Sequence, residues 1–110
     1  MSRDLIDTSV FEELSDTIGA DFMAELVTTF LSDAENMFTD LNRSIADQDA
    51  DGYRRAAHSL KSNALTFGAT PLAEQARAME LSGAFDSAAA TVLRTIFDET
   101  ATVLKGRLDD

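Results

Sequence analysis

The sequence contains no cysteine and no tryptophan, and only one histidine, one proline and one tyrosine among its 110 residues. The absence of cysteine excludes disulfides, thiolate catalysis and sulfur ligands for a metal, and it suits a reducing cytoplasm. The longest apolar runs are only a few residues, and the acidic start of the chain has no signal-peptide pattern. We therefore expect a cytoplasmic protein without membrane-spanning segments.

Positive charge is also scarce, and it is unevenly placed. The formal net charge of −11 argues against nucleic acid as a partner, because phosphate backbones require lysine and arginine contacts. Residues 1–51 carry thirteen acids against only Arg3 and Arg43. Residues 52–73 contain no acid but include three cations, Arg54, Arg55 and Lys61. Such a patch would attract a small anion or a negatively lined partner pocket, although a chance gap in a solvated surface looks the same.

Apolar residues recur every three or four positions, and no segment shows the alternation of a half-buried strand. At this length the chain forms one domain, 1–110. Capping residues, glycines and the single proline divide it into five expected helices: Asp7 or Ser9 to about Ile18, Asp21 to about Ala46, Asp49 or Asp51 to about Phe67, Thr70–Pro71 to just before Gly83, and Asp86 or Ser87 almost to the terminus.

The pattern predicts an all-α protein, an antiparallel four-helix bundle with an additional short N-terminal helix. The apolar positions of the second helix include Phe22 and Leu26, and those of the last helix include Val92. No long uncovered apolar stripe demands a dimer, so we expect a monomer.

Helical geometry predicts that His58 faces solvent. At 100° per residue, the expected core stripe of its helix lies about 140° from the imidazole. That stripe consists of Tyr53, Ala57, Leu60, Ala64 and Phe67. Arg54, Lys61 and Leu65 share the outward side with His58. The ring is then either an ordinary surface residue or a reactive group on an accessible, basic face.

An exposed imidazole titrates near neutrality and offers an unprotonated nitrogen as a nucleophile. Lys61, three residues on, lies on the same helical face and can balance the charge of an attached phosphoryl group. Phosphoryl transfer needs mainly positioning and charge neutralisation, so two such residues suffice when a partner brings the metal. The chain itself has no glycine-rich nucleotide loop.

Other chemistries find less support. The segment DQDADGY at 47–53 faintly echoes a calcium-binding loop, but position twelve is His58 instead of the bidentate glutamate. We interpret this segment as a polar turn between helices. A zinc-binding motif is also unsupported, because the second histidine that such motifs require is absent. Ser59 is a poor nucleophile candidate, because adjacent helical residues do not face each other.

The segment AAHSLKSNALTFGA resembles the signature of histidine-containing phosphotransfer (HPt) domains, H-x-L-K followed by a small residue and, later, a glycine. The resemblance extends over essentially the whole chain, since HPt domains of this size are four-helix bundles. It implies that His58 is the phosphoacceptor through Nε2 and that Lys61 stabilises the phosphorylated form. It also implies that Glu80 hydrogen-bonds the Nδ1 atom, although Glu80 is equally explained as an ordinary exposed helical acid.

The resemblance also implies the partners. The phosphoryl group would come from the aspartyl phosphate of one receiver domain and pass to the aspartate of another, in hybrid sensor kinases and response regulators. The receiver would supply Mg²⁺, so the chain itself would need no cofactor or metal and would be a stoichiometric carrier, not an enzyme. The expected docking surface combines the exposed part of the first helix with five residues: Arg54, Ala57, Ser62, Leu65 and Gly68. Ala64 is a further candidate, and Ser62 stands where the family most often has glycine.

Two alternatives remain open from the sequence. One is a helical adaptor or inhibitory module whose histidine is never phosphorylated. The other is a domain that receives phosphate directly from a kinase's ATP site, which the absence of any attached kinase segment disfavours.

Overall fold

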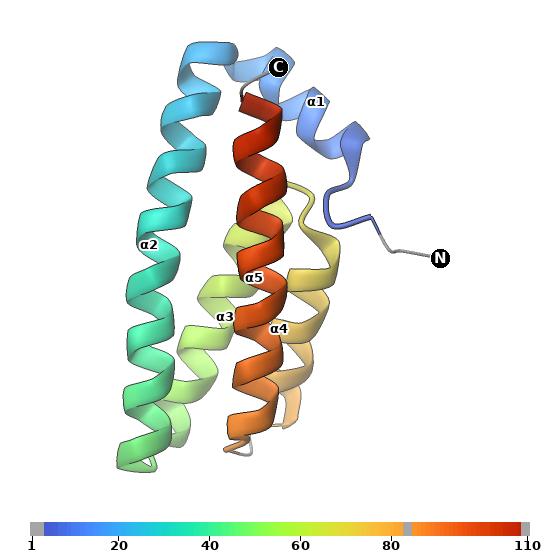
Figure 1. Ribbon diagram of the computed structural model, residues 1–110. Helices are drawn as coiled ribbons and strands as arrows, with labels where there is room; N and C mark the ends of the chain where they lie inside the picture. Colours follow the sequence, from blue (N-terminus) through green and yellow to red (C-terminus); the bar gives the residue numbers. More distant parts are fainter. Residues whose placement is uncertain (1–3, 83–84, 109–110) are drawn as a thin grey trace.

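The computed structural model describes residues 4–82 and 85–108, and these residues form helices joined by short connections. The helices are α1 (Thr8–Ile18), α2 (Ala20–Asp47), α3 (Ala50–Thr66), α4 (Thr70–Ser82) and α5 (Ser87–Leu108). Figure 1 shows α2 to α5 running along the long axis of the molecule, with α1 lying across one end. The prediction of an all-α, antiparallel four-helix bundle with a short additional helix is confirmed.

The helix boundaries follow from the local sequence. Asp7 caps α1 by accepting hydrogen bonds from the backbone N–H groups of Ser9 and Val10. Gly19 adopts a positive φ of 87° between α1 and α2, a conformation that glycine tolerates best. Asp49 caps α3 by accepting from the N–H of Gly52. The expected end of α4 before Gly83 falls at the edge of the described residues, because α4 is assigned to Ser82 and Gly83 lies outside them.

Within the segment at 47–53, the polar interhelical turn that the sequence predicts is reduced to Gln48 and Asp49, and Ala50 already begins α3. Gln48 takes a left-handed conformation with φ 55°, and the Asp49 carboxylate caps α3. Asp51 pairs with Arg54 one turn further along. Within residues 4–82 and 85–108, no group of three or more potential ligand residues is arranged to hold a metal ion.

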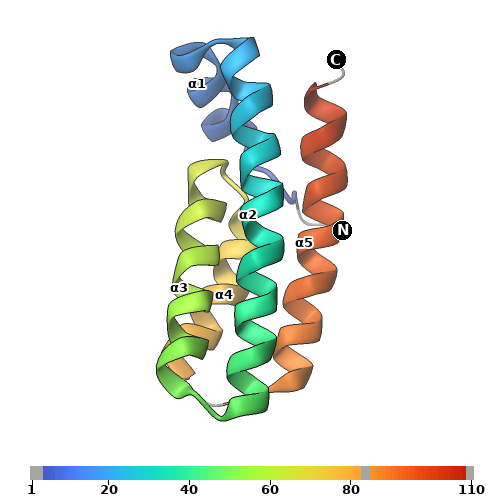
Figure 2. The ribbon, with the colours of Figure 1, turned by 90° about the vertical axis from the view of Figure 1, so that its left-hand side faces the viewer.

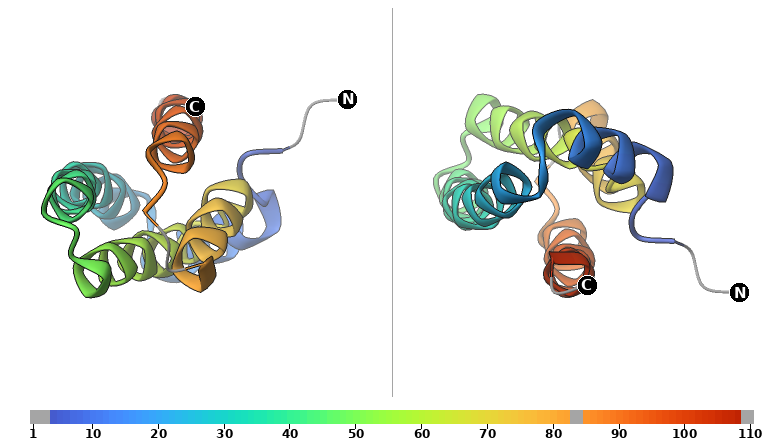
Figure 3. Two further views of the ribbon diagram at one scale, coloured as in Figure 1. Left: turned by 90° about the horizontal axis from the view of Figure 1, so that it is seen from below. Right: turned by 90° about the horizontal axis from the view of Figure 1, so that it is seen from above.

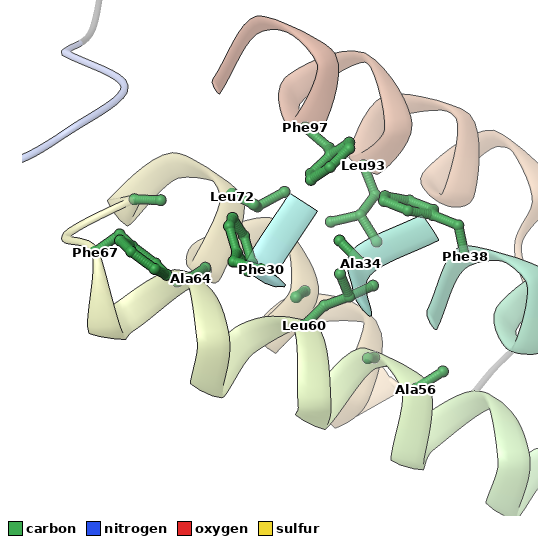
Figure 4. Close-up of a cluster of buried hydrophobic side chains, with 14 of the residues drawn as sticks. Phe30, Ala34, Phe38, Ala56, Leu60, Ala64, Phe67, Leu72, Leu93 and Phe97 are labelled. Carbon is green, nitrogen blue, oxygen red and sulfur yellow. The ribbon is translucent and has the colours of Figure 1, made fainter. Parts of the chain in front are cut away.

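The core lies between the four long helices and is built around phenylalanine rings (Figure 4). Phe30 of α2 packs against Phe67 at 5.0 Å between ring centroids, and Phe97 of α5 packs against Phe38 at 5.3 Å. Leu60 of α3 and Leu72 of α4 are fully buried beside them. Burial of side chains from all four helices fixes the rotation of α3 and therefore the direction in which His58 points.

Three expected apolar positions are exposed. Phe22 and Leu26 of α2 are 66% and 36% exposed, and Val92 of α5 is 48% exposed. Met23 and Val27 are buried in their place at the start of α2. At the start of α2 the reason is helix length, because α2 has 28 residues and its antiparallel neighbour α3 only 17. The first turns of α2 therefore extend beyond α3, where α1 crosses the end of the bundle (Figure 2).

Candidate functional site

The candidate site lies on the outward side of the antiparallel pair α3 and α4. His58 projects from the middle of α3, and 57% of its side chain is exposed. Tyr53, Leu60 and Ala64, which form the opposite stripe of α3, are fully buried. The orientation predicted for the imidazole is therefore confirmed, and its physical cause is the burial of the stripe on the far side of the same helix.

Glu80 of α4 connects the two candidate side chains of α3, His58 and Lys61. Its Oε1 atom lies 2.8 Å from Nδ1 of His58, and its Oε2 atom lies 2.8 Å from Nζ of Lys61. The Glu80 side chain is 19% exposed and that of Lys61 22%, so both are largely covered, whereas the imidazole is not. One carboxylate thus holds a cation with one oxygen and the histidine with the other.

The charge of Glu80 fixes the histidine tautomer. The hydrogen bond and charge of Lys61 lower the pKa of the Glu80 carboxyl below its ordinary value; burial opposes the shift, and the bond to His58 adds to it. An ionised carboxylate can only accept hydrogen bonds, so Nδ1 must be the donor in the contact with Glu80. In the neutral imidazole the proton is then on Nδ1, and the unprotonated Nε2 is the nucleophilic atom.

Several exposed side chains lie near His58 on the outward side of α3. Ser62 is exposed, and Leu65 is an exposed apolar side chain at 55%. Arg54, one turn before the histidine, is exposed and pairs with Asp51. These three residues are accessible to an approaching protein, as the docking prediction requires.

Three of the predicted docking residues are buried, so that part of the prediction is wrong. Ala57 and Ala64 are completely buried because both belong to the core stripe of α3. Gly68 is buried at the corner between α3 and α4, where its carbonyl oxygen accepts a 2.7 Å hydrogen bond from the backbone N–H of Asp7. None of the three offers a contact to a partner.

Gly68 has a structural function instead. Its φ is 72°, and a Cβ at this position would lie 2.9 Å from the Cβ of Val10 and 3.0 Å from the carbonyl oxygen of Asp7. Only glycine allows the start of α1 to lie directly against the α3–α4 corner. The glycine of the motif therefore fixes where α1 sits relative to the histidine-bearing helix.

Sequence reasoning missed two grooves on the surface of the bundle. An open apolar groove lies at the junction of α1 and α2 and includes Ile18, Phe22 and Leu26. A polar groove lies between α2 and α3, where Arg43 and Arg55 are found with acidic neighbours. The length difference between the second and third expected helices was the available signal for the first groove.

No helix among the described residues is long and apolar enough to cross a membrane.

Comparison with known proteins identifies the family. The Hpt domain model matches residues 25–107, a range that contains His58, Lys61 and Glu80. The chain is 31% identical over 80 residues to the phosphorelay protein LuxU of Vibrio harveyi, a match that covers 73% of this chain and 70% of LuxU. The fold resembles the crystal structure of histidine-containing phosphotransfer protein B of Pseudomonas aeruginosa PAO1, with a TM-score of 0.90, 23% identity, and coverage of 98% and 97% of the two chains. The chain therefore belongs to the Hpt domain family, and its role is histidine phosphotransfer in a phosphorelay.

Proposed function

We propose that Nε2 of His58 is the atom that carries the phosphoryl group. The observation that supports this assignment is the contact between Nδ1 and the Glu80 carboxylate, which leaves Nε2 as the unprotonated nitrogen on the exposed side chain. His58 is also the only histidine in the sequence. Family members interact with receiver domains of two-component proteins, and a receiver aspartyl phosphate is the proposed donor.

In the forward step, the lone pair of Nε2 attacks the phosphorus of the acyl phosphate. The N–P bond forms while the bond from phosphorus to the aspartate oxygen breaks, and the aspartate leaves as a carboxylate. No proton has to leave Nε2, because the ring proton is on Nδ1. The product is a positively charged phosphorylated imidazole, and the Glu80 carboxylate stabilises that charge through the hydrogen bond from Nδ1. In the second step, a carboxylate oxygen of another receiver's aspartate attacks the phosphorus. The new O–P bond forms while the N–P bond breaks, and its electron pair returns to Nε2.

Lys61 has two possible partners during this cycle. In the unphosphorylated protein its ammonium group pairs with Oε2 of Glu80. The arriving phosphoryl group brings negative charge to the same face of α3, and we infer that Lys61 then contacts a phosphoryl oxygen. The flexible lysine stem makes this exchange possible without movement of the helix.

We infer that the metal ion for the transfer belongs to the receiver and that the chain is a stoichiometric carrier without turnover of its own. Glu80 is the acid in contact with His58, and both of its oxygens are engaged by His58 and Lys61. Both Glu80 oxygens thus face basic groups, and Mg²⁺ prefers carboxylate ligands together with phosphate oxygens, which the active site of the receiver would supply.

The test is incubation of the protein with a receiver domain carrying ³²P-labelled aspartyl phosphate. We expect label that is stable in alkali and labile in acid, as a phosphorus–nitrogen bond requires, and a loss of at least about 100-fold in labelling for His58→Gln. The exposed site predicts an unchanged melting temperature for this variant. An adaptor whose histidine is never phosphorylated would remain unlabelled with every receiver, and a domain served directly by a kinase would be labelled only by a kinase with ATP.

A further inference from the structure

Ser62 lies one turn after His58 on the same exposed face of α3. Residues four apart in a helix are neighbours, with about 5 to 6 Å between their Cβ atoms. Helical side chains lean toward the N-terminus of their helix, so the Ser62 side chain leans toward the turn that carries His58. The only acid of α3 is Asp51, in the first turn of the helix. A hydroxyl group is therefore present beside the imidazole, where α3 contributes no negative charge.

The contact with Glu80 determines on which side of His58 the unprotonated nitrogen lies. Figure 3 shows α3 between α2 and α4. Glu80 of α4 contacts both His58 and Lys61, so α4 lies on the Lys61 side of the imidazole. Around the helix axis, Lys61 lies about 60° from His58 in one direction and Ser62 about 40° in the other. Nδ1 and Nε2 are on opposite sides of the ring axis through Cγ, so the contact of Nδ1 with α4 turns Nε2 toward solvent and the Ser62 side.

The hydroxyl of Ser62 is available to a new acceptor. It makes no hydrogen bond to any group in the part of the chain that the structure describes. Thr66, one turn further along α3, shows the usual alternative, because its hydroxyl donates to the carbonyl oxygen of Ser62 four residues earlier. The equivalent acceptor for Ser62 is the carbonyl oxygen of His58, and that bond is not formed. The exposed hydroxyl can therefore turn toward a phosphoryl oxygen without breaking an internal hydrogen bond.

Resting on the proposed function, we propose that the hydroxyl of Ser62 donates a hydrogen bond to an oxygen of the phosphoryl group on Nε2 of His58. Lys61 then contacts the phosphoryl group from the α4 side and Ser62 from the α2 side. The third oxygen is directed to solvent and to the receiver. The hydroxyl keeps its proton and does not attack phosphorus, so the bonds that form and break during transfer are unchanged.

This hydrogen bond exists only in the phosphorylated protein, so it shifts the transfer equilibrium toward phosphorylated His58. One hydrogen bond of this kind changes an equilibrium constant about 3- to 10-fold. A contact between Ser62 and a docked receiver would act differently. It would be absent from all the dissociated proteins, so it would change the forward and reverse rates by the same factor and leave the equilibrium between them unchanged.

The first measurement is the equilibrium constant for phosphoryl transfer between the protein and a receiver domain, from the ³²P label on each at concentrations where the two are mostly dissociated. Ser62→Ala removes the hydroxyl and keeps Cβ, whereas Ser62→Gly removes the whole side chain. We expect both variants to lower the constant by the same factor, about 3- to 10-fold.

The matched control is Ser59→Ala. Ser59 is adjacent to His58 in the sequence, but its side chain lies about 100° round the helix and lines the groove between α2 and α3. The same serine-to-alanine change at this position should leave the equilibrium constant at the wild-type value.

The second measurement needs no receiver. The protein is phosphorylated with phosphoramidate, and the phosphoryl group is titrated by ³¹P NMR. A hydroxyl donor stabilises the dianionic form of the phosphoryl group over the monoanionic form and so lowers its pKa. We expect the titration midpoint to be higher in Ser62→Ala than in wild type, and unchanged in Ser59→Ala.

Several results would overturn the proposal. Equal equilibrium constants and equal ³¹P midpoints for wild type and Ser62→Ala would remove the hydrogen bond, and slower transfer at an unchanged constant would assign Ser62 to receiver docking alone. A constant that rises only in Ser62→Gly would show that the bulk of the side chain matters and the hydroxyl does not. An equal fall in Ser59→Ala would show that the effect is not specific to Ser62. If no receiver labels the wild-type protein, the proposed function fails instead, and the ³¹P titration still decides the role of Ser62.

Discussion

Two polar clusters on the surface of this bundle combine acidic and basic side chains in opposite proportions. At the α3–α4 site, one carboxylate, Glu80, lies between two basic groups, His58 and Lys61. Between α2 and α5, one guanidinium, Arg94, lies between two carboxylates. Arg94 pairs with Glu35 of α2 and, at 3.1 Å, with Asp98 of its own helix. Each cluster joins two neighbouring helices across the surface of the bundle.

The clusters differ in the atom that remains available. The guanidinium of Arg94 lies over the rings of Phe38 and Phe97, at 5.1 and 5.4 Å from their centroids, and its charge is balanced on both sides. Its pKa is raised by the bond to Glu35, so it stays charged and unreactive. In the Glu80 cluster the carboxylate contacts both basic groups, and the His58 side chain that carries the unprotonated nitrogen is 57% exposed. A polar cluster performs chemistry only when its internal contacts leave such an atom exposed.

Breaking the α3–α4 cluster should produce the largest effect. Glu80→Ala removes the acceptor for Nδ1 and the partner of Lys61, and we expect transfer to His58 to slow about 30-fold. Glu80→Gln keeps an oxygen that accepts from Nδ1, so we expect most of the rate to return. Single-turnover labelling by a phosphorylated receiver measures both variants. Equal rates for wild type and Glu80→Ala would show that Glu80 is only a surface acid.

The corresponding change in the α2–α5 cluster should affect stability alone. Arg94→Met keeps a long apolar stem over Phe38 and Phe97 but loses both ion pairs and the cation–π contacts. Because the side chain is partly exposed, we expect a loss of about 1 kcal/mol in urea unfolding. The rate of phosphoryl transfer should stay within about twofold of wild type. Slower transfer at unchanged stability would contradict the separation of the two clusters.

The smallest expected effect is the pH dependence of stability that Glu80 contributes. The pKa of the Glu80 carboxyl is lower in the folded chain than in the unfolded chain, where a glutamate has a pKa of about 4.3. The unfolded chain therefore binds this proton more tightly, and the contribution of Glu80 is complete above that pH and is lost as the pH falls through the lower folded value. Urea unfolding between about pH 6 and pH 3 should show a steeper loss for wild type than for Glu80→Gln. Parallel curves would contradict the shift.

The sequence predicted the parts of this account that depend on one helix or on a local motif. The exposure of His58 follows from the periodicity of its own helix, because buried Leu60 and Ala64 determine which side faces out. The contact between His58 and Glu80 depends on how α4 is positioned along α3, and the resemblance to a known family supplied that relation. The polar turn around Asp49 followed from capping residues alone.

The errors concern relations between helices that the periodicity of one helix does not contain. Phe22 belongs to an apolar pattern, but its exposure depends on the end of α3, which lies short of the first turns of α2. Gly68 was assigned to the docking surface because it is part of the motif, whereas the chain before α1 covers it. Ala57 is the exception, because the periodicity of α3 alone already placed it in the core stripe, and its burial follows from that periodicity.

The most direct test of the central claim is the nitrogen chemistry of the single histidine. Long-range ¹H–¹⁵N NMR of the unphosphorylated protein, with the imidazole neutral, should show the proton on Nδ1 and an unprotonated Nε2. After phosphorylation by a receiver domain, coupling to ³¹P should appear at Nε2. A neutral ring protonated on Nε2, or phosphorus attached to Nδ1, would contradict the role assigned to Glu80 and to the exposed face of His58.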